Sequence, residues 1–323
     1  MTIPVTLGFG VYNISIIDSI TVFFQHLTGN IVDVKADRYI WDVRLPRALG
    51  AVVLGAGLSV AGAVMQNNFK NPLAEPYTMG ISSGAFMGVV VAMVTGITII
   101  PGLTGQAGFT VNAFCFGLIP IAMILLISRF RKVSPVSMIL IGIAIMFLFN
   151  SLSQIMLLAS SAETLQDAYT WRVGNTSRIY WAELPIMTTA TVIVVAIIWI
   201  LSDKLNVMYA GDRGAQSMGI KPQLLRLSTL TLVSLMTAAI VSVTGTIGFI
   251  GLVGPHIARV FVGSNNRYLI PASAAFGAIF MALADTVAKV TGPDGLPVGI
   301  ICSMVGGPLF IYILIKRSKK VWI

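Results

Sequence analysis

Residues 44–84 of the chain read RLPRALGAVVLGAGLSVAGAVMQNNFKNPLAEPYTMGISSG. After the charged signature at 44–47, an apolar run over 48–65 is interrupted only by small residues, and its length suits a membrane-spanning helix. The stretch 66–76 is too polar to lie in lipid, and a second apolar segment begins at Tyr77. The pattern predicts one membrane helix, a structured turn and the start of the next helix, and the rest of the chain repeats it.

The composition is that of an integral membrane protein. Of the 323 residues, 56% are hydrophobic and 10% are charged, whereas soluble domains carry about 25% charged residues. We expect an all-α polytopic protein, one transmembrane domain over residues 1–323 with no attached catalytic domain. The apolar segments long enough to span a bilayer cover residues 45–67, 77–99, 110–130, 137–160, 184–202, 223–244, 247–263, 269–290 and 296–315.

The net charge of +9 could indicate nucleic-acid binding, but the positions of the basic residues predict membrane topology instead. Counted over alternating loops, one side holds seven of the 21 Lys and Arg residues and the other holds fourteen. Cytoplasmic loops are the Lys/Arg-rich ones. We therefore expect a cell-membrane protein with a cytoplasmic C-terminus, an external segment at 13–43 and a cytoplasmic segment at 203–222, and no nucleic-acid partner.

The N-terminal region does not complete this topology. Residues 13–43 predict one short amphipathic helix near Ile17–Leu27, and no signal peptide precedes it. Nine spans would leave the N-terminus outside, which is unusual without such a signal. We therefore expect a first helix that is largely missing, ending near residues 8–10.

Two short stretches resemble each other. Residues 59–65 (SVAGAVM) and 242–248 (SVTGTIG) each follow a long apolar helix and precede a polar or proline-bearing turn. By the charge count the two helices run in opposite directions, so the pair predicts an inverted repeat, a common plan of transporters.

Glycines recur every third residue at Gly245, Gly248 and Gly251, followed by Pro255 and His256. Such small faces allow close helix packing. Gly/Pro-interrupted segments also lie near transport pathways, and the sequence leaves both interpretations open.

Three cations and one carboxylate are candidates for function near the outer face. Arg44 and Arg47 flank Pro46, and they suit either interfacial anchoring or the docking of an acidic partner, which Lys289 could join. Asp285 lies within an apolar helix, where an ionisable side chain indicates a functional group. It is also four residues from Lys289, so an i,i+4 ion pair is an equal alternative.

The segment 203–222 is weakly charged and rich in small residues, which favours a docking element over a plain loop. The sequence contains no Gly-x4-Gly-Lys-Ser/Thr phosphate loop, so any ATP used must be bound by another polypeptide. His26 and His256 are too far apart in sequence to predict a metal site, and Cys115 and Cys302 read as packing residues.

The chain resembles the permease subunits of ABC importers for iron–siderophores, haem and cobalamin, over about residues 8–316. The matching motifs are Arg44-Leu45-Pro46-Arg47, Gly62-Ala63-Val64-Met65-Gln66, Asn71-Pro72-Leu73-Ala74-Glu75-Pro76, Gly248-Phe249-Ile250-Gly251-Leu252-Val253 with Pro255-His256, and Leu296-Pro297-Val298-Gly299.

The resemblance implies a ten-helix fold, a homodimer with the pathway between its copies and lined by 137–160, and no enzymatic activity or cofactor in this chain. Two partner ATPases would bind ATP and Mg. An extracytoplasmic binding protein would meet Arg44, Arg47 and Lys289. The implied ATPase-docking residues are Leu205, Gly211, Asp212, Arg213, Ala215, Met218, Gly219 and Ile220. The implied cytoplasmic gate comprises Asn71, Pro72, Leu73, Ser134, Pro135, Val136 and Ser137.

Iron–siderophore is the expected cargo, with haem, cobalamin or an oxyanion as alternatives, and an apolar pathway would leave recognition to the binding protein. Two other classes remain: an ion-coupled secondary transporter that uses Asp285, and a membrane scaffold that transports nothing. Uptake that requires ATP and a separate ATPase distinguishes the first hypothesis from both.

Overall fold

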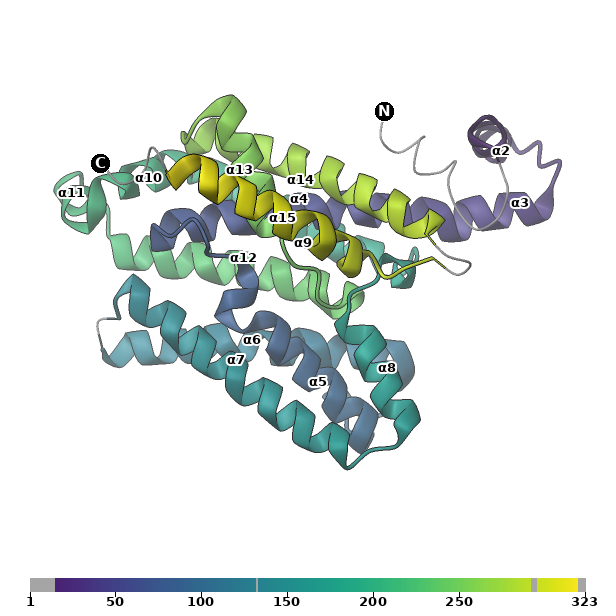
Figure 1. Cartoon of the computed structure of the whole chain (residues 1–323), viewed down its shortest axis with the longest axis horizontal. Coiled ribbons are helices and arrows are strands. Elements are labelled where there is room, and N and C mark those ends of the chain that lie inside the picture. Colours follow the sequence, from purple (N-terminus) through teal and green to yellow (C-terminus); the bar gives the residue numbers. More distant parts are fainter. Residues whose placement is uncertain (1–14, 132, 292–294, 319–323) are drawn as a thin grey trace.

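The computed structural model describes residues 15–131, 133–291 and 295–318, which form a helical bundle (Figure 1). The all-α prediction is confirmed, and within the described residues each predicted span corresponds to one helix. These helices are α4 (Leu45–Phe69), α5 (Ile81–Thr95), α6 (Gly105–Phe130), α7 (Pro135–Leu158), α9 (Leu184–Ile200), α12 (Pro222–Thr244), α13 (Ile250–Val262), α14 (Asn266–Val290) and α15 (Val298–Ser318). The shorter elements are α2 (Ile16–Thr28), α3 (Val34–Arg38), η1 (Tyr39–Arg44), η2 (Pro76–Met79), α8 (Ala162–Arg172), η3 (Thr176–Arg178), α10 (Ser202–Val207), η4 (Met208–Ala210) and α11 (Gly211–Ser217).

The helices differ in how far they could cross a membrane. Five are long and apolar enough to span alone, and α9 adds a sixth together with the α10–α11 segment, from which it is bent by 59°. The helices α5, α13 and α15 are apolar but shorter. The short 3-10 helix η2 leads into α5, and the residues 245–248 that lead to α13 are non-helical. The predicted remnant of a first helix, ending near residues 8–10, lies outside the described residues.

Helix α4 is the centre of the bundle. It packs against α9, α12, α13 and α14, and 78% of its most apolar stretch is buried. The small residues that interrupt its apolar run explain this position, because they let neighbouring backbones approach closely. At Gly55, a Cβ atom would overlap the backbone carbonyl of Gly277 in α14, and at Gly277 it would overlap that of Gly55.

The helical run that contains the first predicted span begins before that span. Residues Val34–Phe69 form one continuous helical run, whereas the charged residues before position 45 had indicated an external loop. The run passes through the π turn η1, where the Leu45 N–H donates to the Ile40 carbonyl five residues earlier. Pro46 has no N–H and its ring crowds the preceding turn, and a π turn accommodates such a residue without ending the helix.

The polar turn after α4 folds back into the bundle. Lys70 ends α4 in the left-handed region, with φ 49°, and η2 then brings Tyr77 to the loop before α13. There the Tyr77 hydroxyl donates to the Ile247 carbonyl over 2.6 Å and accepts from the Ile247 N–H over 3.2 Å. The turn that follows the first repeated motif therefore binds the second motif itself.

The helices α4 and α12 run antiparallel, as the inverted repeat predicted. Asn68, at the end of α4, bonds to Thr229 near the start of α12. Gly57, near the middle of α4, lies against Ile240 near the end of α12. The two helices thus run in opposite directions, as their charge pattern predicted.

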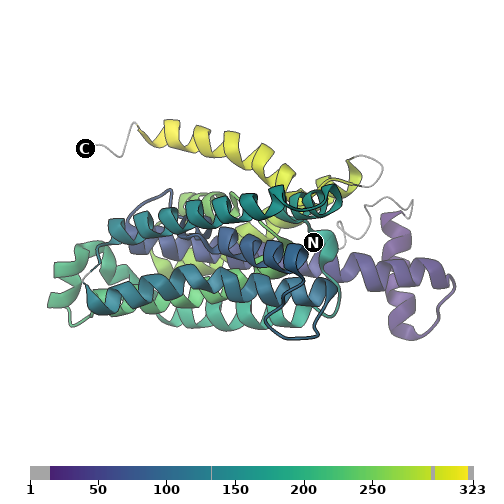
Figure 2. The ribbon, with the colours of Figure 1, turned by 90° about the horizontal axis from the view of Figure 1, so that it is seen from below.

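The bundle has two ends. One end, the α11 end, contains α10, α11 and the end of α4. The opposite end, the α3 end, contains α3, α8 and the end of α14 (Figure 1). The predicted amphipathic helix near Ile17–Leu27 is confirmed as α2, which lies across the axis of α4 (Figure 2). Trp171 of α8 is buried beside Phe86, with ring centroids 6.2 Å apart.

Candidate functional site

The predicted docking segment is a folded unit at the α11 end of the bundle. Leu205 and Ala215 are fully buried and anchor it. Gly211 begins α11 with φ 88°, a value that only glycine adopts without strain. The side chains of Arg213 and Met218 are exposed. The predicted docking residues therefore divide into buried anchors and an exposed surface. That surface comprises Asp212, Arg213, Met218 and Gly219, and Gly211 and Ile220 are half-buried.

A buried arginine joins this unit to the central helix. Arg226 of α12 is 2% exposed, and its Nε donates to the backbone carbonyl of Asn68 over 3.1 Å. Its Nη2 lies 2.8 Å from Oδ1 of Asp212 and its Nη1 lies 3.4 Å from Oδ2, so the guanidinium contacts both carboxylate oxygens. A bidentate pair of this kind fixes direction as well as distance. Movement of α11 is thereby linked to the end of α4.

Two asparagines at the end of α4 add further links. Asn67 donates to the backbone carbonyl of Leu205 in α10 over 3.3 Å, and Asn68 donates to the Thr229 hydroxyl over 2.8 Å. Both asparagines are buried. The end of α4 therefore bonds to α10 and α12 and, through Arg226, to α11.

The two predicted gate segments lie at this same end. The Leu73 N–H donates to Oδ1 of Asn71, and Ser134 caps α7 by accepting from the Ser137 N–H. Pro72 and Leu73 are exposed, as are Ser134 and Val136. A cavity of about 470 Å³ separates Ser134 and Pro135 from the Asp212 side of the docking segment. The structure thus places the second gate segment beside the docking segment.

A charge cluster occupies the α3 end. The carboxylate of Asp285 in α14 is fully buried, with Oδ1 2.9 Å from Nε of Arg47 and Oδ2 2.7 Å from Nζ of Lys289. The Thr176 hydroxyl also donates to Oδ1. Paired in this way, the carboxylate ties α14 to α4 and to η3. The predicted i,i+4 pair of Asp285 and Lys289 is confirmed.

The three predicted docking cations are less accessible than a surface role requires. Arg44 is 2% exposed and lies over the Tyr39 ring, and Lys289 is 5% exposed. The side chain of Arg47 is 16% exposed. The distribution of Lys and Arg residues along the sequence predicts which side of the membrane a loop faces. It does not predict whether a particular side chain is buried. Their role in docking a binding protein remains a prediction that would need this end to open.

The glycine motif lies at the start of α13. A Cβ atom on Gly62 of α4 would overlap the Gly251 backbone, and Gln66 donates to the Gly251 carbonyl over 3.1 Å. Gly245 has φ 74° and its α-carbon faces the Trp171 carbonyl, whereas Gly248 has open space around it. Close packing therefore accounts for Gly245 and Gly251.

His256 and Pro255 lie in the same helix, α13, and both are buried. The Nδ1–H of His256 donates to the Leu252 carbonyl over 2.7 Å, and its ring contacts the Phe310 ring edge-on. Among the residues that the structure describes, no three His, Cys, Asp or Glu side chains gather as metal ligands.

Comparison with known proteins identifies the family. A model of the FecCD transport family matches residues 1–316. The chain belongs to the FecCD transport family. This FecCD chain is 34% identical to the hemin transport system permease protein HmuU of Yersinia pestis, over 87% of the chain and 85% of that protein. It is 30% identical to the molybdate import system permease protein MolB of Haemophilus influenzae, over 99% and 93%.

A solved structure supports the same assignment. An inward-facing metal-chelate type ABC transporter matches the FecCD chain with a TM-score of 0.85 at 29% identity, over 98% of this chain and 95% of that one. The FecCD chain is therefore an ABC importer permease, a multi-pass membrane protein of the group that serves metal chelates, haem, cobalamin and molybdate.

Sequence reasoning missed Arg226, the buried arginine that joins α11 to the end of α4. Arg226 was counted only as one cytoplasmic charge, although it lies in an apolar helix where an ionisable side chain indicates function. The same signal applied to Asp285, which was singled out. Gln66 was also missed, and it accepts a hydrogen bond from Arg259 while donating to Gly251.

Proposed function

We propose that this FecCD chain is one half of a homodimeric permease that imports iron–siderophore chelates. The α11 end and the C-terminus face the cytoplasm, and the α3 end faces outward. Two separate ATPase subunits bind ATP and Mg and dock at the α11 end. An extracytoplasmic binding protein delivers the chelate, and this chain carries no catalytic activity or cofactor of its own.

The observation that supports this proposal is the construction of the docking segment. Its anchors, Leu205 and Ala215, are fully buried. Its outer surface is exposed and carries the charged Arg213 together with Met218, which is 66% exposed. An exposed apolar side chain beside a charged one is typical of a protein–protein contact. The chain has no phosphate-binding loop, so a partner that binds nucleotide suits this surface.

The bonds at the α11 end suggest how a partner's movement reaches the pathway. When ATP closes the partner ATPases, they displace α11. Asp212 moves with α11, and Arg226 transfers the displacement to Asn68 at the end of α4. Closely packed helices move as rigid bodies, so α4 carries α13 and α14 with it. The two halves of the dimer then open one face at a time.

The exposed face of α7 supports a pathway between two copies. Only 28% of its most apolar stretch is buried, and several of its large apolar side chains are exposed among the described residues. They are Leu140, Phe147, Leu148, Leu152 and Ile155. Such a face suits a large chelate with an organic shell, because it offers contact area without a tight site.

The competing hypothesis of an ion-coupled transporter depends on Asp285. That carboxylate is occupied by Arg47, Lys289 and Thr176 and is fully buried. Coupling to an ion would require it to exchange these partners in each cycle. The structure therefore favours a structural role for Asp285, and the ATP-driven hypothesis accounts for more of the site.

Charge reversal at Arg213 tests the docking surface. We expect Arg213→Glu to weaken binding of the partner ATPase by about tenfold, because a repulsive charge at a contact costs on the order of 1.4 kcal/mol. Co-purification and titration of the ATPase measure this. Arg267→Glu, also exposed at the α11 end but outside the segment, is the matched control. Equal retention by the two variants would exclude Arg213 from the contact.

A further inference from the structure

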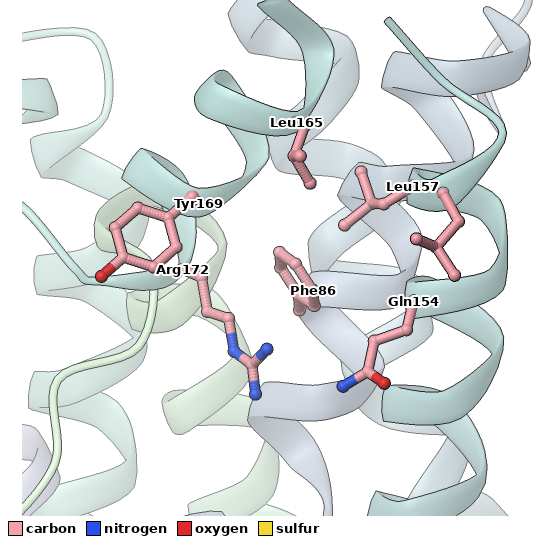
Figure 3. Close-up of a pocket in the computed structure, with 7 residues that line it drawn as sticks. Phe86, Gln154, Leu157, Leu165, Tyr169 and Arg172 are labelled. Atoms are coloured by element: carbon pink, nitrogen blue, oxygen red, sulfur yellow. The ribbon is translucent and has the colours of Figure 1, made fainter. Parts of the chain in front are cut away.

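A cavity of about 330 Å³ opens between α5, α7 and α8 toward the α3 end. Phe86, Leu157 and Leu165 form its apolar walls, and Gln154 and Arg172 are polar (Figure 3). A few polar groups set in an apolar cavity are typical of a small-molecule site, and this volume is at the lower end of the usual range. It would hold one edge of a chelate and leave the rest in the pathway.

The guanidinium of Arg172 lies against the aromatic wall of this cavity. Its Cζ is 5.2 Å from the centroid of the Phe86 ring. The Phe86 ring also stacks on buried Trp171, at an interplanar angle of 25°. The Arg172 guanidinium therefore lies over Phe86, and Phe86 in turn packs on Trp171. Within the described residues no ion pair joins Arg172 to a carboxylate, in contrast to Arg47 and Arg226. An exposed guanidinium without a counter-charge attracts an anion.

The amide of Gln154 points from α7 toward Arg172 across the cavity, with the Phe86 ring between and above them in the view of Figure 3. Gln154 and Arg172 are both exposed, so a ligand can reach them. A carboxylate between these side chains could accept hydrogen bonds from both, while its apolar body contacts Phe86 and Leu157.

We propose that this cavity is a transit site for the anionic edge of the transported chelate. The inference depends on the proposed function, in which α7 lines the pathway and the α3 end receives the chelate. It narrows the cargo to chelates that carry carboxylates on an apolar body. It also modifies the expectation that recognition rests with the binding protein alone. The open cavity favours weak binding, as a conducting pathway requires.

Haemin is a suitable probe, because it is an apolar chelate with two carboxylates, and its dimethyl ester lacks those charges. We expect Arg172→Gln to raise the dissociation constant of haemin by about tenfold, the cost of about one charged hydrogen bond. Arg172→Lys should recover most of the affinity. Binding of the dimethyl ester should be unchanged. The measurement is quenching of tryptophan fluorescence in phosphatidylcholine nanodiscs.

Arg267→Gln, at the opposite end of the bundle, is the control and should bind haemin as the parent chain does. Equal losses for haemin and its ester, or no loss in Arg172→Gln, would overturn the proposal. So would loss of haemin binding on adding phosphatidylglycerol, which would assign the cavity to lipid headgroups. Each variant is also assayed for retention of the partner ATPase. If Arg172→Gln retains the partner ATPase and binds haemin with unchanged affinity, only the transit site is rejected. If no form of the chain binds the ATPase, the proposed function is rejected.

Discussion

Gly62→Ala is expected to destabilise the bundle by about 3 kcal/mol or more, the upper part of the range for overpacked cores. The added methyl would overlap the backbone of Gly251 at the first turn of α13. Neither contacting group is a flexible side chain, so relief requires α4 and α13 to separate. Separation would also break the bond from Gln66 to the Gly251 carbonyl.

Gly248→Ala is the matched control, because it introduces the same methyl three residues before Gly251. A Cβ atom there meets nothing within 4 Å. The midpoint of thermal unfolding in detergent, followed by size-exclusion chromatography, should fall by roughly 5 °C or more for Gly62→Ala. It should barely change for Gly248→Ala. Equal midpoints would show that α4 and α13 do not approach as described.

Arg226→Gln is expected to uncouple ATP hydrolysis from transport. The substitution removes the donors to Asn68 and Asp212, and hydrogen bonds of charged groups contribute about 1.5–3 kcal/mol. Asp212 is 47% exposed on its side chain and can be hydrated once the arginine is lost. The docking surface should therefore survive while its connection to α4 is lost. Chelate transported per ATP should fall by about tenfold or more.

The measurement is uptake and hydrolysis in the same proteoliposomes. Asp212→Asn breaks the same pair from the other side, so its effect and that of Arg226→Gln should not add in the double variant. Arg267→Gln serves as the control. An unchanged ratio of transport to hydrolysis in Arg226→Gln, with normal ATPase binding, would contradict the proposed linkage.

The apolar runs predicted the helices well, because about 20 residues without charge can satisfy their backbone in lipid only as a helix. The pairing of Asp285 with Lys289 was also accessible from the sequence, since four residues make one turn. The glycines at 245–251 indicated close packing, which the structure shows at Gly245 and Gly251. The family motifs supplied the positions of the docking and gate segments, and the structure shows that the docking segment is a folded unit.

Contacts between distant segments were not accessible. The turn after α4 was predicted to be structured, but its partner was not, since Tyr77 bonds to Ile247, 170 residues away. Hydropathy describes each segment alone and cannot report that a polar turn folds back. The burial of Arg44 and Lys289 could not be predicted for a similar reason, because residues of other helices determine the surroundings of both side chains. Arg226 was missed since its partners lie on α4 and α11.

The most direct test of the ATP-driven account is uptake of radiolabelled ferric siderophore into proteoliposomes. One set of vesicles holds this chain alone, and the other holds the chain with its partner ATPase and binding protein. We expect uphill accumulation only in the second set and only with internal ATP and Mg. Accumulation by the chain alone, driven by a proton or sodium gradient, would contradict the account.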